Sequence, residues 1–114
     1  MKIESDHIGN MLVVTPYDHR IDASSAADFK SQLSNWIHDG NCHILLDLSQ
    51  ISFIDSSGLG AIVSLLKQLA GKGDIRMCNI QEPVMALFKL TRMDRIFKIY
   101  QSSAEAIEAM TAIG

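Results

Sequence analysis

The sequence has 114 residues, of which 47% are hydrophobic, and its formal net charge is -3 at pH 7. This length fits one compact domain with its own core, so we expect a single domain over residues 1–114. No apolar run approaches the roughly 20 residues that span a bilayer, the N-terminus lacks the apolar core of a signal peptide, and the Lys and Arg residues are too scattered to form a stripe for nucleic acid. These features predict a cytoplasmic protein that contacts neither membranes nor nucleic acids.

The first part of the chain is predicted to form a hairpin, a helix and a further strand. Residues 11–15 are rich in β-branched and large apolar side chains and follow a Gly-Asn turn pair, which predicts a hairpin with residues 2–7. Apolar residues recur at helical spacing over 24–38. The nearly continuous apolar run over 43–48 is typical of a central strand covered on both faces.

The rest of the chain continues this alternation of strand and helix. The remaining predicted elements are a short apolar segment at 51–54, a helical stripe over 59–69, a strand over 75–80, a helix over 83–92, a strand over 96–100 and a last helix. The order β-β-α-β-α-β-α-β-α implies an α/β domain, with a mixed sheet of four to five strands and about four helices. Sites in such sheets gather where strand ends meet helix starts.

Several helix starts carry sequence signals of their own. Ser25 and Asp28 have the spacing of a capping box. Pro83 suits the first turn of a helix, because its missing N–H would be unpaired there in any case. Ser102 or Ser103 can cap the last helix.

One segment, residues 53–60, combines an acid, two hydroxyls and two glycines at the junction of strand and helix. Ser56 is predicted as the N-cap of the helix, and the small Gly58 and Gly60 leave the backbone open to another molecule. A phosphate on Ser56 would add a charge of about -1.5 to -2 at the positive end of the helix, where an anion is favoured. A partner docked there would lose affinity. The structural alternative is that Asp55 and Ser56 only cap the helix and the glycines only allow tight packing.

The residues from 47–48 through 53–60 resemble the signature of STAS domains in bacterial anti-sigma factor antagonists. The resemblance extends over nearly the whole chain: residues 84–90 followed by 96–99 are similar to the third helix of that family and the segment after it. It implies the STAS fold and a protein that catalyses no reaction itself.

The same resemblance implies a partner-switching role. The first serine after the aspartate, here Ser56, is the phosphoacceptor in that family. The unphosphorylated protein binds an anti-sigma factor that is also a GHKL-type serine kinase, and a PP2C-type phosphatase restores it after phosphorylation. By this likeness Asp22 is the acidic residue of the loop near the acceptor. The resemblance therefore predicts a partner surface that comprises Asp22, Asp55, Ser56, Ser57, Gly58 and Leu59.

One departure from the family concerns the loop beside the switch. The family often has Gly-Glu or Gly-Arg before its Leu-Asp or Ile-Asp pair, whereas this chain has His19-Arg20. The change affects the identity of the partner rather than the fold. From the residues alone, Ser57 is also not separable from Ser56 as the acceptor.

Three other functions fit parts of the sequence. A serine hydrolase is disfavoured because Asp55 stands where its motif needs Gly before Ser57. In addition, all four His residues precede Ser56 and Ser57, whereas the catalytic His of such a hydrolase comes last in the chain. A nucleotide site is disfavoured because the Gly-Lys-Gly at 71–73 is no P-loop. The third alternative is a STAS scaffold in a transporter, stressosome or lipid-trafficking complex that is not phosphorylated.

The sulfur-containing residues predict packing rather than chemistry. Cys42 and Cys78 lie far apart in apolar segments, without the spacing of zinc ligands, so two buried, reduced thiols are expected. We predict no metal and no cofactor. Met85 and Met93 flank the third predicted helix and fit core packing better than a docking surface.

Overall fold

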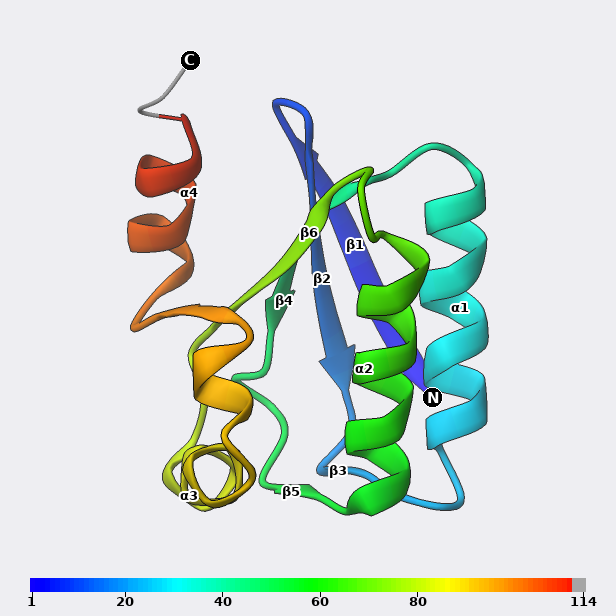
Figure 1. Cartoon of the computed structure of the whole chain (residues 1–114), viewed down its shortest axis with the longest axis vertical. Coiled ribbons are helices and arrows are strands. Elements are labelled where there is room, and N and C mark those ends of the chain that lie inside the picture. The colour runs from blue at the N-terminus through cyan, green and yellow to red at the C-terminus, as the bar shows by residue number, and fades with distance from the viewer. Residues whose placement is uncertain (112–114) are drawn as a thin grey trace.

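The computed structural model describes residues 1–111 and contains a five-stranded sheet with helices on both of its sides (Figure 1). The strands are β1 (Lys2–Ile8), β2 (Met11–Tyr17), β4 (His43–Asp47), β6 (Asp74–Cys78) and β7 (Lys98–Tyr100), and they follow the order β1-β2-β4-β6-β7. β1 and β2 form an antiparallel hairpin, and all other neighbours are parallel. The predicted mixed sheet is therefore confirmed.

The helices alternate with the strands. They are α1 (Ala26–His38), α2 (Ser56–Gln68), α3 (Glu82–Thr91) and α4 (Ser103–Thr111), with a short 3-10 helix η1 (Met93–Arg95) after α3. Figure 1 shows α1 and α2 along one side of the sheet, α4 on the opposite side and α3 at the foot of the molecule. None of the helices formed by residues 1–111 is long and apolar enough to cross a membrane.

The core is divided by the alternation of side chains along the strands. One face of the sheet, with Leu46 and Met77, packs against α1, α2 and α3 in the main core. Leu45 and Cys78, their neighbours in sequence, point to the other face and pack under Ala106 of α4. Residues on both faces of β4 are buried, as its continuous apolar sequence predicts.

A second, two-stranded ladder lies outside the main sheet. β3 (Arg20–Ile21) pairs in parallel with β5 (Phe53–Ile54), so that the loop after β2 lies against the segment before α2. The sequence indicates an apolar segment at 51–54, but it does not predict β3. This ladder brings two stretches of chain about thirty residues apart to the start of α2.

Several predicted element ends are confirmed and others are corrected. Pro83 lies in the first turn of α3, and the Ser102 hydroxyl accepts a bond of 3.1 Å from the N–H of Glu105 at the start of α4. The capping box of Ser25 with Asp28 is wrong, since the Ser25 hydroxyl bonds to Asp22 instead. The last strand begins at Lys98 rather than at residue 96, because the chain first turns through η1.

The predicted burial of the thiols and methionines is partly confirmed. Cys78 and Cys42 are free, and Cys78 is buried, but Cys42 is only half-buried. Met93 packs against the main core. Met85 is half-buried on α3 and lines a hollow at the surface. The predicted domain end at Gly114 lies outside the described residues.

Candidate functional site

The start of α2 is capped by Asp55, and the prediction that Ser56 is the N-cap is wrong. One carboxylate oxygen of Asp55 accepts from the Gly58 N–H at 3.0 Å, and the other accepts from the Ala23 N–H at 3.1 Å. A carboxylate satisfies two donors at once, which a single serine hydroxyl does less well. Asp55 therefore fastens the loop after β3 to the first turn of α2.

Because Asp55 caps the helix, the two serines that follow it are left at the surface. Ser56 and Ser57 are both exposed, and within residues 1–111 neither hydroxyl has a hydrogen-bond partner. Their N–H groups, at the first two positions of α2, also lack an acceptor in this part of the chain. The helix start thus presents free hydroxyls and free donors to solvent.

The surroundings of the two serines differ. Ser57 lines a hollow of about 260 Å³ between α1 and α2, together with Lys30 and Ser64. Ser56 does not line it. The two hydroxyls therefore have different neighbours, although they are adjacent in sequence.

Gly58 is needed for packing within the chain rather than for access by another molecule. It is buried, and a Cβ placed on it would lie 2.4 Å from the backbone oxygen of Ile21 and 2.7 Å from a methyl of Ile54. Both of those residues belong to the β3–β5 ladder. Gly60, by contrast, is exposed, and a Cβ placed on it would have no atom within 4 Å. Gly58 sets the distance between α2 and the ladder, and Gly60 alone matches the predicted open backbone.

Asp22 lies in the same loop, but its own chain already occupies its carboxylate. It accepts from the Ser24 hydroxyl at 2.6 Å and the Ser24 N–H at 3.0 Å, and lies 3.5 Å from the Arg20 guanidinium. The hydrogen bond from the Ser24 hydroxyl is the main cause that lowers the pKa of Asp22. Asp22 is therefore ionised at neutral pH and shapes the loop beside Ser56.

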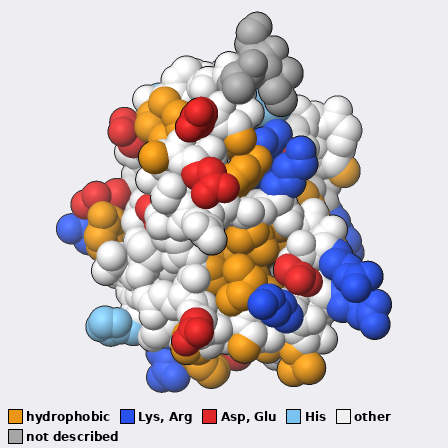
Figure 2. All heavy atoms as spheres, turned by 90° about the vertical axis from the view of Figure 1, so that its left-hand side faces the viewer, with side chains coloured by type: hydrophobic (Ala, Val, Ile, Leu, Met, Phe, Trp, Pro, Cys, Tyr) orange, Lys and Arg blue, Asp and Glu red, His pale blue; other side chains and the backbone are white. Residues whose placement is uncertain are grey.

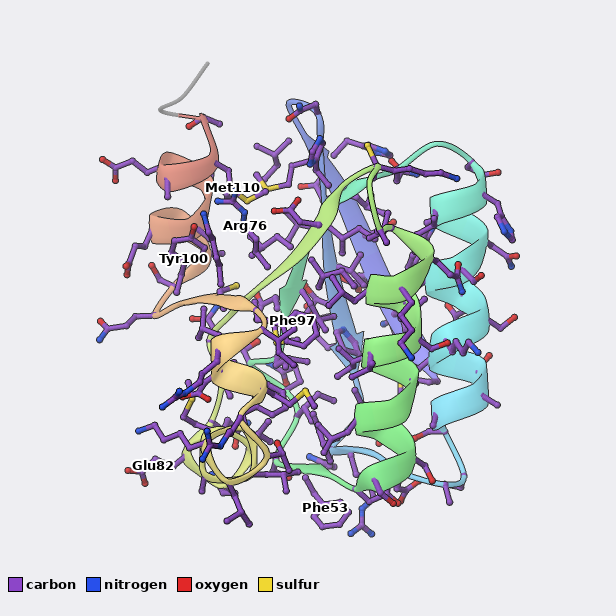
Figure 3. The ribbon with its side chains drawn as sticks, in the orientation of Figure 1. Phe53, Arg76, Glu82, Phe97, Tyr100 and Met110 are labelled. Atoms are coloured by element: carbon purple, nitrogen blue, oxygen red, sulfur yellow. The ribbon has the colours of Figure 1, made fainter. Side chains whose placement is uncertain are left out.

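An exposed aromatic residue, which the sequence does not single out, borders the site. Phe53 is 44% exposed, and the Arg20 guanidinium lies over its ring at 4.8 Å from the centroid. Figure 3 shows Phe53 at the foot of the molecule, between α3 and the start of α2. The contact follows from the pairing of Phe53 with Arg20 in the β3–β5 ladder, and this pairing cannot be read from the sequence.

The arrangement offers a hydroxyl without any group to activate it. No carboxylate or imidazole within residues 1–111 is hydrogen-bonded to Ser56, and His19 is exposed and contributes its backbone oxygen to Ser52. No group of three or more His, Cys, Asp or Glu residues in the same stretch is placed to hold a metal ion. Among the described residues, Ser56 is therefore an exposed hydroxyl with no hydrogen-bonded acid or base.

Comparison with known proteins identifies the family. The sequence profile of the STAS domain matches residues 2–106. The chain is 28% identical to the anti-sigma F factor antagonist of Paenibacillus polymyxa over 99% of this chain and 97% of the relative. It superposes with a TM-score of 0.87 on the Thermotoga maritima protein TM1081, at 29% identity over 94% of this chain and 92% of the other.

The anti-sigma factor antagonist SpoIIAA of Bacillus has the same fold. At 20% identity, its unphosphorylated form superposes with a TM-score of 0.81 over 99% of both chains, and its phosphorylated form gives 0.72 at 19% identity over 96% of this chain and 99% of the other. The profile match covers nearly all of the described residues. The chain belongs to the STAS domain family, and within that family it is similar to the anti-sigma factor antagonists.

Proposed function

We propose that this chain is an anti-sigma factor antagonist, and that phosphorylation of Ser56 switches off its binding to an anti-sigma factor that is also a GHKL-type serine kinase. The observation that carries the proposal is the exposed Ser56 hydroxyl at the first position of α2, where Asp55 already caps the helix. A phosphate on Ser56 breaks no hydrogen bond among residues 1–111. The existence of phosphorylated and unphosphorylated forms of SpoIIAA supports the same assignment.

The kinase supplies all the chemistry of the transfer. The Ser56 Oγ forms a bond to the γ-phosphorus of ATP, the bond from that phosphorus to the β–γ bridging oxygen breaks, and ADP leaves. The hydroxyl proton passes to a base of the kinase, whose bound Mg²⁺ neutralises the developing charge. A PP2C-type phosphatase hydrolyses the ester and restores the free hydroxyl.

The switch acts through charge at one end of a helix. Phosphate adds a charge of about -1.5 to -2, which the free N–H groups and the dipole at the start of α2 stabilise. The modified domain therefore stays folded. A partner surface over the same spot meets a new dianion, which weakens binding through repulsion and desolvation unless the partner offers cations.

Some residues of the proposed partner surface contact the partner, and the others hold the contacting residues in place. Ser56 and Ser57 are exposed and meet the partner directly. Asp22, Asp55 and Gly58 hold the loop, the ladder and α2 together beneath them. Leu59 is half-buried against the main core and completes the first turn of the helix.

The test compares the wild type with Ser56→Ala, Ser56→Asp, Ser57→Ala and Ser57→Asp. The probes are the purified GHKL-type serine kinases encoded in the genome of origin, with affinity measured by calorimetry and the phosphate located by mass spectrometry after ATP is added. We expect phosphate on Ser56 in the wild type and in Ser57→Ala, but not in Ser56→Ala. We expect Ser56→Asp to weaken binding by about tenfold or more, which is about 1.4 kcal/mol, and Ser56→Ala to bind as the wild type does.

The Ser57 variants are the matched control, because Ser57 is also exposed and lies one residue along the same turn. Phosphate on Ser57 would move the switch to the hollow that Lys30 lines. If no kinase modifies the chain, or if Ser56→Asp binds unchanged, the chain is a constitutive STAS scaffold instead.

A further inference from the structure

The charge of this chain is distributed unevenly. Residues 89–98 hold four cations and one acid, a net charge of +3, whereas the whole chain carries -3, so that the other residues carry -6. The sequence as a whole has no basic stripe, and its negative net charge conceals the concentration of cations in this one segment. The cations are Lys89, Arg92, Arg95 and Lys98.

These cations are exposed, and among residues 1–111 they have no acidic partner. All four side chains lie at the surface, and in the described part of the chain none comes within 4.0 Å of a carboxylate. Other cations of this chain do find such partners, including Arg20 with Asp22 and Arg76 with Asp74. The segment thus presents uncompensated positive charge.

Large apolar side chains are exposed in the same segment. Leu90, near the end of α3, is 82% exposed, and Ile96, directly after η1, is 53% exposed. They are separated by a sharp turn in which Arg92 adopts a positive φ of 62°. We call Lys89, Leu90, Arg92, Arg95 and Ile96 the α3–η1 patch. Isolated exposed apolar residues are common, but two beside unpaired cations form a combined surface.

A hollow of about 460 Å³ adjoins this patch along α3. Pro83, Met85 and Ala86 line it, with Glu82 at one end and Lys89 at the other. Figure 2 views the molecule from this side, and apolar side chains gather in the middle of the face with both basic and acidic side chains beside them. All five lining residues belong to α3, so the hollow is a shallow depression on the outer face of this helix, against which an apolar side chain of a partner can pack.

Helix α3 connects the α3–η1 patch with the proposed switch. α3 packs against β5, and β5 leads directly into Asp55 and Ser56. The exposed ring of Phe53 lies between α3 and the start of α2 (Figure 3). One partner that covers Ser56 and Phe53 can therefore also reach α3.

We propose that the α3–η1 patch docks an acidic segment of the same partner that covers Ser56, with an apolar side chain of that segment seated in the hollow beside Met85. This inference rests on the proposed function. Opposite charge on the partner matches the unpaired cations, and the hollow matches a protruding side chain, which a lipid or nucleic-acid phosphate does not supply. An acidic partner surface also meets the Ser56 phosphate unfavourably, so the patch would make the switch more effective.

The test is a pair of charge reversals with the same change in net charge. Lys89→Glu/Arg95→Glu alters the α3–η1 patch, and Lys67→Glu/Lys72→Glu is the matched control at the other end of α2. Lys89 and Lys67 each lie in the last turn of a helix, so these two substitutions affect the stability of their helices alike. The probe is the purified GHKL-type kinase that binds the wild type in the experiment above.

We expect Lys89→Glu/Arg95→Glu to weaken kinase binding at least tenfold, chiefly by slower association, and to reduce its dependence on salt. We expect the control to remain within about twofold of the wild type. Leu90→Ser, at a position that contributes little to the core, should weaken binding severalfold without any charge change. It serves as the second variant if the double reversal unfolds.

The outcomes distinguish a failure of the proposed function from a failure of this inference alone. If the wild type binds no kinase, the proposed function and this inference both fail. If the wild type binds, Ser56→Asp weakens binding and all patch variants bind like the control, only this inference fails. Binding of the wild type to phosphatidylglycerol vesicles but not to phosphatidylcholine vesicles, abolished by Lys89→Glu/Arg95→Glu, would assign the patch to an anionic membrane and overturn the protein partner.

Discussion

Two glycines in one helix turn should respond to the same substitution with opposite sign. Gly58→Ala places a methyl 2.4 Å from the Ile21 oxygen, whereas ordinary contacts begin at 3.4 Å, so the ladder must move by about 1 Å. That oxygen also accepts from the Asp55 N–H at 3.3 Å. Gly60→Ala meets nothing within 4 Å. The first substitution therefore strains the site, and the second does not.

The magnitudes follow from these contacts. Forcing a group into a packed region costs about 1–3 kcal/mol, and weakening the backbone hydrogen bond costs about 1 kcal/mol more. Replacing a helical Gly by Ala returns up to about 1 kcal/mol in either variant. We expect Gly58→Ala to lower the free energy of unfolding by about 1–3 kcal/mol and Gly60→Ala to raise it by about 0.5–1 kcal/mol, using these same values.

Urea unfolding followed by circular dichroism measures both free energies, and thermal unfolding gives the midpoints. At about 4 °C per kcal/mol for a chain of this size, the two midpoints should differ by about 10 °C. Equal midpoints, or a Gly58→Ala variant more stable than Gly60→Ala, would show that α2 does not rest against the Ile21 backbone as described. The account of how the ladder positions Ser56 would then be wrong.

The remaining predictions concern the cap, a charged network and a buried thiol. Asp55→Ala should lower the free energy of unfolding by about 1–2 kcal/mol, and Asp55→Asn by less, because an amide oxygen still accepts one of the two N–H groups; equal losses in urea titrations would contradict the capping role. Burial raises the pKa of Asp74, but hydrogen bonds from Arg76 and His43 outweigh it and leave this pKa below its usual value of 3.8. The ionised carboxylate of Asp74 therefore stabilises the fold at pH values above 3.8, and this stabilisation is lost as the pH falls through the lowered pKa of the folded state. The difference in free energy of unfolding between wild type and Asp74→Asn should thus be constant near neutrality and shrink in acid. A gap that grows in acid would show the opposite sign. Burial, and then the charge of Asp47, raise the pKa of Cys78 to about 12, so this thiol should resist a disulfide reagent at pH 8 until the chain is unfolded, and fast labelling of the native protein would contradict its burial under α4.

The order of elements could be predicted from the sequence because the main signals are local. Helical spacing of Phe29 and Leu33 is enough to predict α1, and the continuous apolar run is enough to predict β4. Phe29, Leu33 and the centre of β4 are buried, as expected. The position of the candidate site between Ile54 and Leu59 could likewise be predicted, since a strand end followed by a helix start is visible in the residues. These features need no knowledge of distant contacts.

The remaining features depend on contacts between distant segments. Asp55 is a better cap than Ser56 because the Ala23 N–H, thirty-two residues away, also requires an acceptor. Gly58 is needed because Ile21 approaches it, and the two-residue strand β3 exists only through its pairing with β5. The hollow beside Met85 needs the orientation of α3, which periodicity alone does not give.

The β3–β5 ladder has a consequence for how such proteins diversify. The loop that contains Asp22 is attached to the domain by the two residue pairs of this ladder, by the bond from the Ala23 N–H to Asp55 and by the buried side chain of Ile21. Within residues 1–111 it takes no part in the hydrogen bonding of the five-stranded sheet. Its length and sequence can therefore change in evolution while the sheet keeps its register. A paralogue could acquire a new partner by exchanging this loop alone, and a designed chimera that retains Ile21, Asp55 and Gly58 offers a direct way to retarget the domain without redesigning its core.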